Sequence, residues 1–375
     1  MPAPSGHEMT ARLSNWNHRC RTLMNGPTAS PFSLKIYHHV DEAGEAAWNE
    51  LAAGRPFQSS AWYRYGERVM DDCEPVYMVV YREGQPIARA TFWLIRNEPL
   101  PVSVHINDEL NPILKRWPLF ICRSPLSNSS GLILPEATPR DAILQFIARE
   151  AEKQAKLYHC SFLIFDFLTQ GEKDSPGWPG GYIRLTGGGP GTRMKVQWSS
   201  FENYIESRDS RNRRRIAHDK RKAAELGIGI TKYTSVGSLE DALRLIQRVE
   251  DKYQSPHNPW MRKLLENMNM VESTFLEARA GTELVGCELL LYDNQVQLPT
   301  ALGHAGSAEY DYLEILYTNI CEAIEKGCQF MRWGSGSYDI KRHLGFELEY
   351  SNNLVVCGVN RFSKMLTRAG TLFVQ

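Results

Sequence analysis

Residues 274–334 read TFLEARAGTELVGCELLLYDNQVQLPTALGHAGSAEYDYLEILYTNICEAIEKGCQFMRWG, and this stretch determines the fold class. Two β-rich runs flank Gly281-Thr282, which predicts a hairpin. A third strand, QVQLPTAL, follows at 295–302. The apolar spacing of 310–326 predicts a long helix that ends at Gly327, and a short strand follows at 330–333. Strands that precede and follow a helix in this order define one α/β unit.

The first half of the chain repeats this order of elements without a close repeat of sequence. LKIYHHV predicts a strand, VYMVVY and PIARATFWLI a hairpin around Glu83-Gly84, residues 139–156 a helix, and CSFLIFDFL a buried strand. The fold class is therefore α/β (α+β), with two tandem domains, each a mixed, mostly antiparallel sheet flanked by helices. Residues 95–117, rich in Pro and Asn, are expected to form a long loop.

Domain limits follow from composition. We expect a flexible arm over 1–33, one domain over 34–190 and a second over 191–375. The Gly/Pro-dense residues 171–191 are the predicted linker or mobile loop between them. The last β-rich run, LEYSNNLVVCGV, is expected to close the second sheet.

The composition favours a globular chain that does not cross a membrane. No apolar run approaches the roughly 18 residues that a bilayer requires, and the N-terminus has no continuous apolar segment, so we expect a cytoplasmic protein. The eight cysteines are scattered without a CxxC pair, so neither a metal site nor a disulfide framework is predicted.

Charge is unevenly distributed although the formal net charge is zero. Residues 208–222 hold eight basic and two acidic residues, a local charge of +6. In the predicted helix, Arg211, Arg214, Arg215 and Lys222 lie on one side together with His218. Clustered arginines repel one another unless an anion neutralises them, and the guanidinium fork suits phosphate. The alternative is a solvated basic face without a ligand.

Two loops in the second half carry further candidates. Gly306 and Ser307 precede the helix at 310–326, where backbone N–H groups can hold a phosphate, although the same residues also suit an ordinary tight turn. In WGSGSYDIKRHLGFE a strand ends at Trp333. Tyr338, Asp339, Lys341 and Arg342 then follow on a short helical segment at the carboxyl end of that strand, a frequent place for ligands.

The run 310–346, with its YLEILYTNICEAIEKG helix, Gly/Ser turn, Lys341 and terminal LGF, resembles the C-terminal GNAT domain of Fem-type aminoacyltransferases. RNRRRIAHDKRKAAELGI resembles the segment before that domain, and PFQSSAWYRYGE more loosely resembles the N-terminal lobe. The resemblance implies two GNAT-like domains and transfer of an acyl or aminoacyl group to an amine, from charged tRNA or acyl-CoA. Gly306-Ser307-Ala308 matches the end of the family's pyrophosphate loop, and the leading Gln or Arg is absent.

Direct aminolysis of an ester or thioester requires a neutral amine and help for the oxyanion and the leaving group. We expect Lys341, supported by Arg342, to meet the donor phosphate or the leaving group. Tyr338 or Tyr310 is the candidate proton donor. The candidate bases are three carboxylates, Asp311, Glu314 and Asp339, or water alone.

Three functions compete on these grounds. The preferred one is transfer of an aminoacyl group from aminoacyl-tRNA to the amine of a small-molecule or peptide acceptor, with tRNA as partner and no tightly bound cofactor. The alternative is an acyl-CoA- or acyl-carrier-dependent N-acyltransferase. The third is a relative without catalytic activity that binds RNA or polysaccharide.

Overall fold

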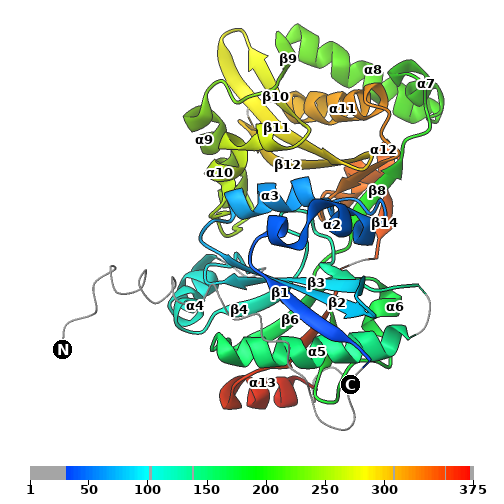
Figure 1. Ribbon diagram of the computed structural model, residues 1–375. Coiled ribbons are helices and arrows are strands. Elements are labelled where there is room, and N and C mark those ends of the chain that lie inside the picture. Colours follow the sequence, from blue (N-terminus) through cyan, green and yellow to red (C-terminus); the bar gives the residue numbers. More distant parts are fainter. Residues whose placement is uncertain (1–30, 101–103, 137–138, 307–308, 351, 372–375) are drawn as a thin grey trace.

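The computed structural model describes residues 31–371, apart from 101–103, 137–138, 307–308 and 351 (Figure 1). The chain forms two lobes, each built on one sheet. Residues 1–30 of the predicted arm lie outside the described residues, and Ser33 already begins the first strand.

The first sheet has eight strands in the order β1-β2-β3-β4-β6-β15-β7, with β5 paired to β3. Their bounds are β1 Ser33–Tyr37, β2 Glu74–Arg82, β3 Gln85–Ile95, β4 Leu119–Cys122, β5 Leu132–Ile133, β6 Phe162–Leu168, β7 Ile183–Thr186 and β15 Asn353–Gly358. The second sheet has seven strands in the order β14-β8-β13-β12-β11-β10-β9. These are β8 Gly191–Lys195, β9 Ile228–Tyr233, β10 Ser273–Ala280, β11 Glu283–Asp293, β12 Val296–His304, β13 Phe330–Trp333 and β14 Glu347–Glu349.

Helices cover both sheets and fill the space between the lobes. Those of the first half are η1 Val40–Ala43, α2 Glu45–Ala52, α3 Ser60–Val69, α4 Val104–Arg116, α5 Arg140–Leu157 and α6 Gln170–Lys173. Those of the second are α7 Phe201–Glu206, α8 Ser210–Glu225, α9 Leu239–Lys252, α10 Met261–Glu266, η2 Met268–Met270, α11 Glu309–Glu325, α12 Tyr338–Leu344 and α13 Arg361–Thr371. No helix within the described residues is long and apolar enough to cross a bilayer.

The predicted fold class is confirmed: each sheet is mixed, mostly antiparallel and flanked by helices. Both predicted hairpins are present. The first turns at Glu83 and Gly84, whose φ angles of 52° and 82° match the left-handed turn that twisted strands prefer. In each sheet one parallel pair follows a helical crossover, β4 with β6 and β12 with β13.

Two expectations about irregular segments are wrong. Residues 104–116 form helix α4 instead of a long loop. Pro and Asn suggested chain breaks, but Leu110 and Leu114 recur at helical spacing, and Leu114 is buried. The segment 171–191 is not a free linker either, because it contains β7 and the buried Trp178.

The last predicted strand does not close the second sheet. Only β14 lies there, paired with β8. The chain then crosses back, and β15 inserts between β6 and β7 of the first sheet. This placement buries Val355 and Cys357 in the first-lobe core. Residues 353–371 therefore pack with the first lobe, whereas the sequence analysis placed them in the second.

The two lobes share one hydrophobic cluster. Trp62 and Tyr65 of α3 belong to the same buried cluster as Leu264 of α10 and Leu289 of β11. The Tyr65 hydroxyl donates to the Leu264 carbonyl over 2.9 Å. Continuous burial of this kind fixes the orientation of the two lobes, since separating them exposes large apolar surfaces to water.

Asp293, at the end of β11, joins the lobes through the start of α3. Its carboxylate accepts hydrogen bonds from the Phe57 N–H and, over 3.1 Å, from the Ser59 hydroxyl. Ser59 is the N-cap of α3, so the negative charge lies at the positive end of the helix dipole. Burial nevertheless raises the pKa of Asp293 above its usual range.

We expect Asp293→Ala to lower the free energy of unfolding by about 2–3 kcal/mol, because it leaves buried donors of the first lobe without an acceptor. Urea unfolding measures the loss. The matched control is Asp251→Ala, whose side chain is 69% exposed and contacts only His257 among the pairs found in the described residues. Equal small losses in both variants would contradict this role of Asp293.

Candidate active site

The second sheet opens where β12 and β13 diverge. These parallel strands pair only at Val296–Phe330 and Gln297–Met331. Beyond that point β12 continues to His304, while β13 ends at Trp333 and the chain turns into α12. On its other edge β12 carries a bulge opposite Glu288, where Ala301 adopts a φ of 53°. The divergence leaves the edge of β12 that faces β13 without a strand partner over its second half, within the described residues.

Six polar or ionisable side chains gather beneath this divergence. We call them the splay cluster: Glu288, His304, Asp311, Tyr312, Asn319 and Lys341. The Asn319 amide donates to the Glu288 carboxylate over 2.5 Å. The Lys341 ammonium donates to the carbonyl of Gly334 over 2.6 Å, which ties α12 to the end of β13. Glu288 is 4% exposed and Lys341 8% exposed, so an acidic and a basic side chain are both nearly removed from water.

Burial shifts the pKa values of both Glu288 and Lys341 in the direction that favours the neutral form of each side chain. It raises the pKa of Glu288 to about 8, against the Asn319 hydrogen bond and the charge of Lys341, which lower it. It lowers the pKa of Lys341 to about 8, against the opposing influence of Glu288. Groups that titrate near neutrality in a recessed position are typical of catalytic sites.

His304 and Asp311 lie at the other end of the splay cluster. The His304 Nδ1 atom is 4.0 Å from an Asp311 oxygen, and neither this nitrogen nor the second Asp311 oxygen has a hydrogen-bond partner among the described residues. Burial lowers the pKa of His304, which keeps the imidazole neutral at pH 7. Its ring stacks on Tyr312 with centroids 5.5 Å apart. Tyr312 in turn hydrogen-bonds Ser337 at the start of α12, so it links the two ends of the cluster.

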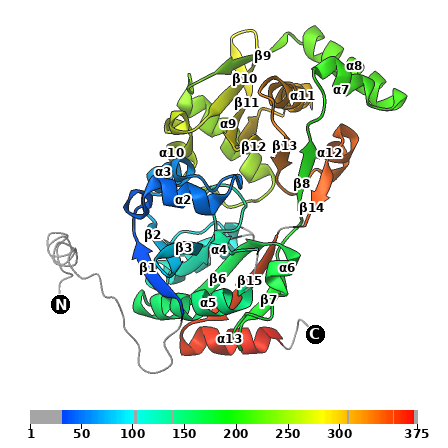
Figure 2. The same ribbon diagram turned by 45° about the vertical axis from the view of Figure 1, so that its right-hand side comes forward.

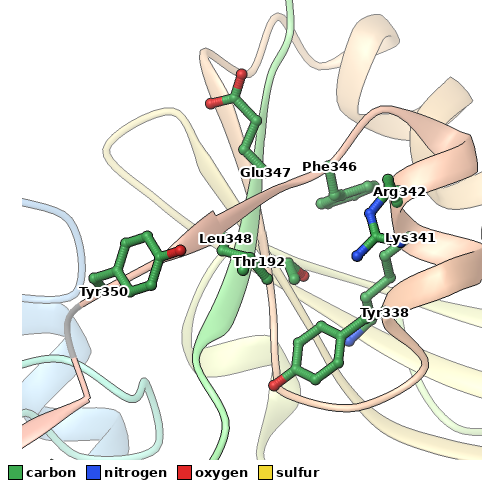
Figure 3. Close-up of a pocket in the computed structure, with 8 residues that line it drawn as sticks. All are labelled: Thr192, Tyr338, Lys341, Arg342, Phe346, Glu347, Leu348 and Tyr350. Atoms are coloured by element: carbon green, nitrogen blue, oxygen red, sulfur yellow. The ribbon is translucent and has the colours of Figure 1, made fainter.

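A cavity of about 390 Å³ lies beside α12 and shares Lys341 with the splay cluster (Figure 3). Its lining comes from α12, β8 and β14 and comprises Thr192, Tyr338, Lys341, Arg342, Phe346, Glu347, Leu348 and Tyr350. Figure 3 shows Tyr338, Lys341 and Arg342 projecting from α12 and Tyr350 on the far side of β14. The Tyr338 hydroxyl donates to the Pro190 carbonyl over 2.8 Å. The structure thus places three of the predicted residues around one cavity.

The other predicted residues of this loop and of α11 lie apart from the cavity. Asp339 is exposed, and the Arg342 guanidinium that lines the cavity also pairs with it over 3.1 Å. Tyr310 lies at the start of α11, where its ring is 6.2 Å from that of His218. Asp311 belongs to the splay cluster, and Glu314 pairs with Lys220 of α8 over 3.1 Å.

Helix α8 carries the basic residues beside α11. Asp209 caps it by accepting from the N–H groups of Arg211 and Asn212 over 2.9 Å. Arg211 and Arg214 are exposed, and no carboxylate within the described part of the chain pairs with either. Arg215 is 3.9 Å from Asp219, and Lys222 pairs with Glu225 over 2.6 Å. The predicted face is therefore only partly neutralised from within.

The amino-terminal half of α8 also reaches α12. Asn212, Arg215 and Ile216 line a small cavity together with His343 and Leu344 of α12. Just before α8, Arg208 donates to the Leu344 carbonyl over 3.4 Å. The amino-terminal half of α8, which also carries the unpaired Arg211 and Arg214, is therefore adjacent to α12.

The junction between β12 and α11 is partly occupied by the protein itself. Gly306 adopts a φ of 69°, and its N–H donates to the Asp311 carboxylate, which also accepts from Tyr312 over 2.6 Å. Ser307, the other predicted phosphate contact, lies outside the described residues. A carboxylate that fills such N–H groups opposes a second anion there, both by occupancy and by repulsion.

The corresponding divergence in the first lobe is filled by an ion pair. β4 and β6 pair through Cys122–Phe165, and Arg123 follows directly. Arg123 binds Glu98 through two hydrogen bonds of 2.7 and 2.6 Å, with both side chains nearly buried. The first lobe therefore has no open counterpart to the splay cluster among its described residues.

The site residues predicted from the sequence did not include Glu288, His304, Tyr312 and Asn319. Glu288 carried a signal, because it interrupts the apolar run VGCELLLY of a buried strand. The others carried none, since only the bulge in β12 and the crossing of α11 bring them together.

No protein-family model matches the chain, and no curated protein sequence does. Solved structures do match. The crystal structure of FemX has a TM-score of 0.59 at 10% identity and covers 89% of this chain and 100% of its own. A tandem GNAT protein from the clavulanic acid biosynthesis pathway has a TM-score of 0.55 at 11% identity and covers 88% and 99%. A protein of unknown function from Bacteroides thetaiotaomicron reaches 0.54 at 8% identity.

These structures define the class of fold. The chain has the tandem GNAT fold, and its likeness to FemX and to the tandem GNAT protein extends over both lobes. The predicted resemblance to Fem-type and GNAT proteins is confirmed at the level of the fold.

The raised pKa of Glu288 predicts a pH-dependent contribution to stability. A carboxyl whose folded pKa lies above its unfolded value stabilises the fold below the unfolded pKa of about 4.5, and this contribution disappears as pH rises through about 8. We expect the free energy of unfolding of the wild type, relative to Glu288→Gln, to fall by on the order of 3 kcal/mol between pH 5 and pH 8.

Urea unfolding across this pH range measures the difference. Glu272→Gln is the matched control, since the Glu272 side chain is 64% exposed and pairs with Lys326 at the surface. A flat difference between the wild type and Glu288→Gln would contradict the assigned protonation.

Proposed function

We propose that the protein is an N-acyltransferase that moves an aminoacyl group from aminoacyl-tRNA to the amine of a small-molecule or peptide acceptor. The observation that carries the proposal is the divergence of β12 and β13 with Lys341 and His304 beneath it, in a chain with the tandem GNAT fold. The open edge of β12 offers backbone groups to an acyl carbonyl, and the buried side chains supply a cation and a base.

The charges around α11 support an RNA donor. Arg211 and Arg214 are exposed and pair with no carboxylate among the described residues, and the helix α8 that carries them adjoins α12 through Asn212 and Arg215. Binding of a polyphosphate backbone to such a surface releases counterions and is favourable at moderate salt. At the β12–α11 junction, by contrast, the Asp311 carboxylate already occupies the Gly306 N–H, which disfavours a diphosphate.

The acyl-transfer step requires one proton acceptor and one proton donor. The acceptor amine attacks the ester carbonyl, a C–N bond forms, and the C–O bond to the ribose breaks. We assign the removal of the amine proton to neutral His304, whose Nδ1 atom lies 4.0 Å from Asp311, and the stabilisation of the oxyanion to the Lys341 ammonium. The ribose oxygen leaves with a proton from Tyr338 or from solvent.

The cavity beside α12 is the proposed entry for the acceptor. Its volume of about 390 Å³ suits a small molecule or the end of a peptide, and its wall mixes Tyr338 and Tyr350 with Glu347 and Arg342. A cytoplasmic location is part of the proposal, since charged tRNA is found there.

Acyl-CoA is the alternative donor. The open edge of β12 and the positive φ of Gly306 at the start of α11 favour it. An assay that supplies charged tRNAs, acyl-CoA or both decides between the donors. Amide product that forms only with charged tRNA and disappears after RNase treatment supports the proposal, and product that forms with acyl-CoA alone refutes it.

Charge reversal on α8 tests the donor surface. We expect Arg211→Glu combined with Arg214→Glu to weaken binding of uncharged tRNA by roughly tenfold or more and to lower the slope of log K against log salt by about 2. The matched control reverses Arg82 and Arg244, which are 50% and 73% exposed and lie on other surfaces. Equal weakening by both pairs would indicate a nonspecific charge effect.

Replacement of Lys341 tests the reaction centre. We expect Lys341→Met to lower kcat by about 10²–10³-fold with little change in KM, because the cation acts on charge that develops in the transition state. In the wild type, kcat should fall as pH rises through about 8, where Lys341 loses its proton. A variant that keeps its melting temperature and its kcat would remove Lys341 from the mechanism.

A further inference from the structure

The first lobe exposes large apolar side chains at one place only among its described residues. They lie on α13, at the end of α5 and at the end of α4, and we call them the α13 patch: Ile113, Trp117, Leu157, Phe362, Met365 and Leu366. Each is between 44% and 65% exposed. Exposed apolar groups that gather from three elements mark an interaction surface more often than scattered ones do.

Hydrogen bonds around Ser161 bring the three elements together. The Ser161 N–H donates to the Pro118 carbonyl over 3.0 Å, and its hydroxyl donates to the Trp117 carbonyl over 3.1 Å. The Val359 N–H, two residues before α13, donates to the Ser161 carbonyl over 3.0 Å. Leu157 ends α5 four residues before Ser161. The end of α4, the end of α5 and the start of α13 therefore lie side by side (Figures 1 and 2).

Helix α13 is oriented opposite to what burial of apolar groups alone would favour. Its buried face carries Ser363 and Thr367, which are 0% and 9% exposed and bond to the backbone of their own helix and of Asn360. Phe362, Met365 and Leu366, at helical spacing i, i+3 and i+4, point outwards. A helix that only covered the first sheet would place these large residues inside, so the outward face requires an occupant of its own.

Cations surround the α13 patch. Lys115 and Arg116 end α4 and are exposed, and Arg361 is exposed at the start of α13. Lys156 and Lys364 share the single carboxylate of Glu152, at 2.8 and 3.6 Å, so one of the two charges is not neutralised there. Apolar groups ringed by such cations suit a surface that combines hydrocarbon with negative charge.

We propose that the α13 patch docks the protein on a membrane surface that contains anionic phospholipids. Trp117 and Phe362 enter the interfacial region, and the lysines and arginines meet the phosphates of the headgroups. Helix α13 lies at the lower end of the molecule and α8 at the upper end in both views, so docking through α13 leaves the basic helix free (Figures 1 and 2). The proposal does not depend on the acyl-transfer reaction.

Co-sedimentation of the full chain with vesicles tests the proposal. We expect binding to vesicles of phosphatidylcholine with phosphatidylglycerol, weak binding to phosphatidylcholine alone, and loss of binding as salt is raised. Trp117→Ser combined with Phe362→Ser should weaken binding by about tenfold or more, and Arg116→Glu combined with Arg361→Glu should abolish the preference for anionic vesicles.

The control replaces two exposed apolar residues of the second lobe, Tyr233→Ser with Met270→Ser, which are 40% and 43% exposed. It should bind as the wild type does, and melting temperatures should show that all variants remain folded. Absence of binding to anionic vesicles, or equal binding by the Trp117/Phe362 variant, would overturn the proposal. So would a wild-type dimer in lipid-free solution that the same variant dissociates, because a second copy would then occupy the patch.

Discussion

The divergence of β12 from β13 is the constraint on which the second lobe depends. Two parallel strands joined by the α11 crossover pair at only two positions, and the gap that follows must be filled. The protein fills it with charged and polar side chains from β11, α11 and α12, so that Glu288 and Lys341 lie almost out of water. Burial of two ionisable side chains costs desolvation free energy unless each finds a hydrogen-bond partner, and here the Gly334 carbonyl and the Asn319 amide supply one each. Because burying these side chains costs desolvation free energy, the presence of the cluster is more simply explained by a chemical role than by a contribution to stability.

The two lobes differ in the side chains that fill the space where a pair of parallel strands diverges. In the first lobe Arg123 and Glu98 close the divergence with a two-point ion pair, and the loop that follows contacts the second lobe through Arg332. The first lobe thereby provides a packed surface against which the second lobe is held. The chain reinforces it by sending β15 and α13 back across the boundary, and by the contact of Asp293 with the start of α3. This difference between the lobes supports the proposal that the donor and the acceptor meet in the second lobe.

Much of the fold could be predicted from local sequence patterns, because hairpin turns and helical periodicity depend on residues that are close together in the sequence. The local pattern predicted α8, α11 and α12, and it placed Lys341 and Tyr338 on the same short helix. It failed where placement depends on distant contacts. The residues LVVCGV do not indicate whether this strand lies at the edge of the second sheet or between β6 and β7 of the first sheet, because an apolar strand can occupy either position. Glu288 was overlooked for the same reason: its partners Asn319 and Lys341 are 31 and 53 residues away, and only the folded chain unites them.

We propose that the reacting carbonyl lies in the gap between β12 and β13, above Lys341. A crystal structure with a short RNA ending in a non-hydrolysable 3′-amide analogue of aminoacyl-adenosine tests this claim most directly. We expect the amide carbonyl to lie along the edge of β12 beside Lys341, with the phosphates leading towards Arg211 and Arg214 of α8. Density for the aminoacyl group in the first lobe, or phosphates on another face of the molecule, would contradict it.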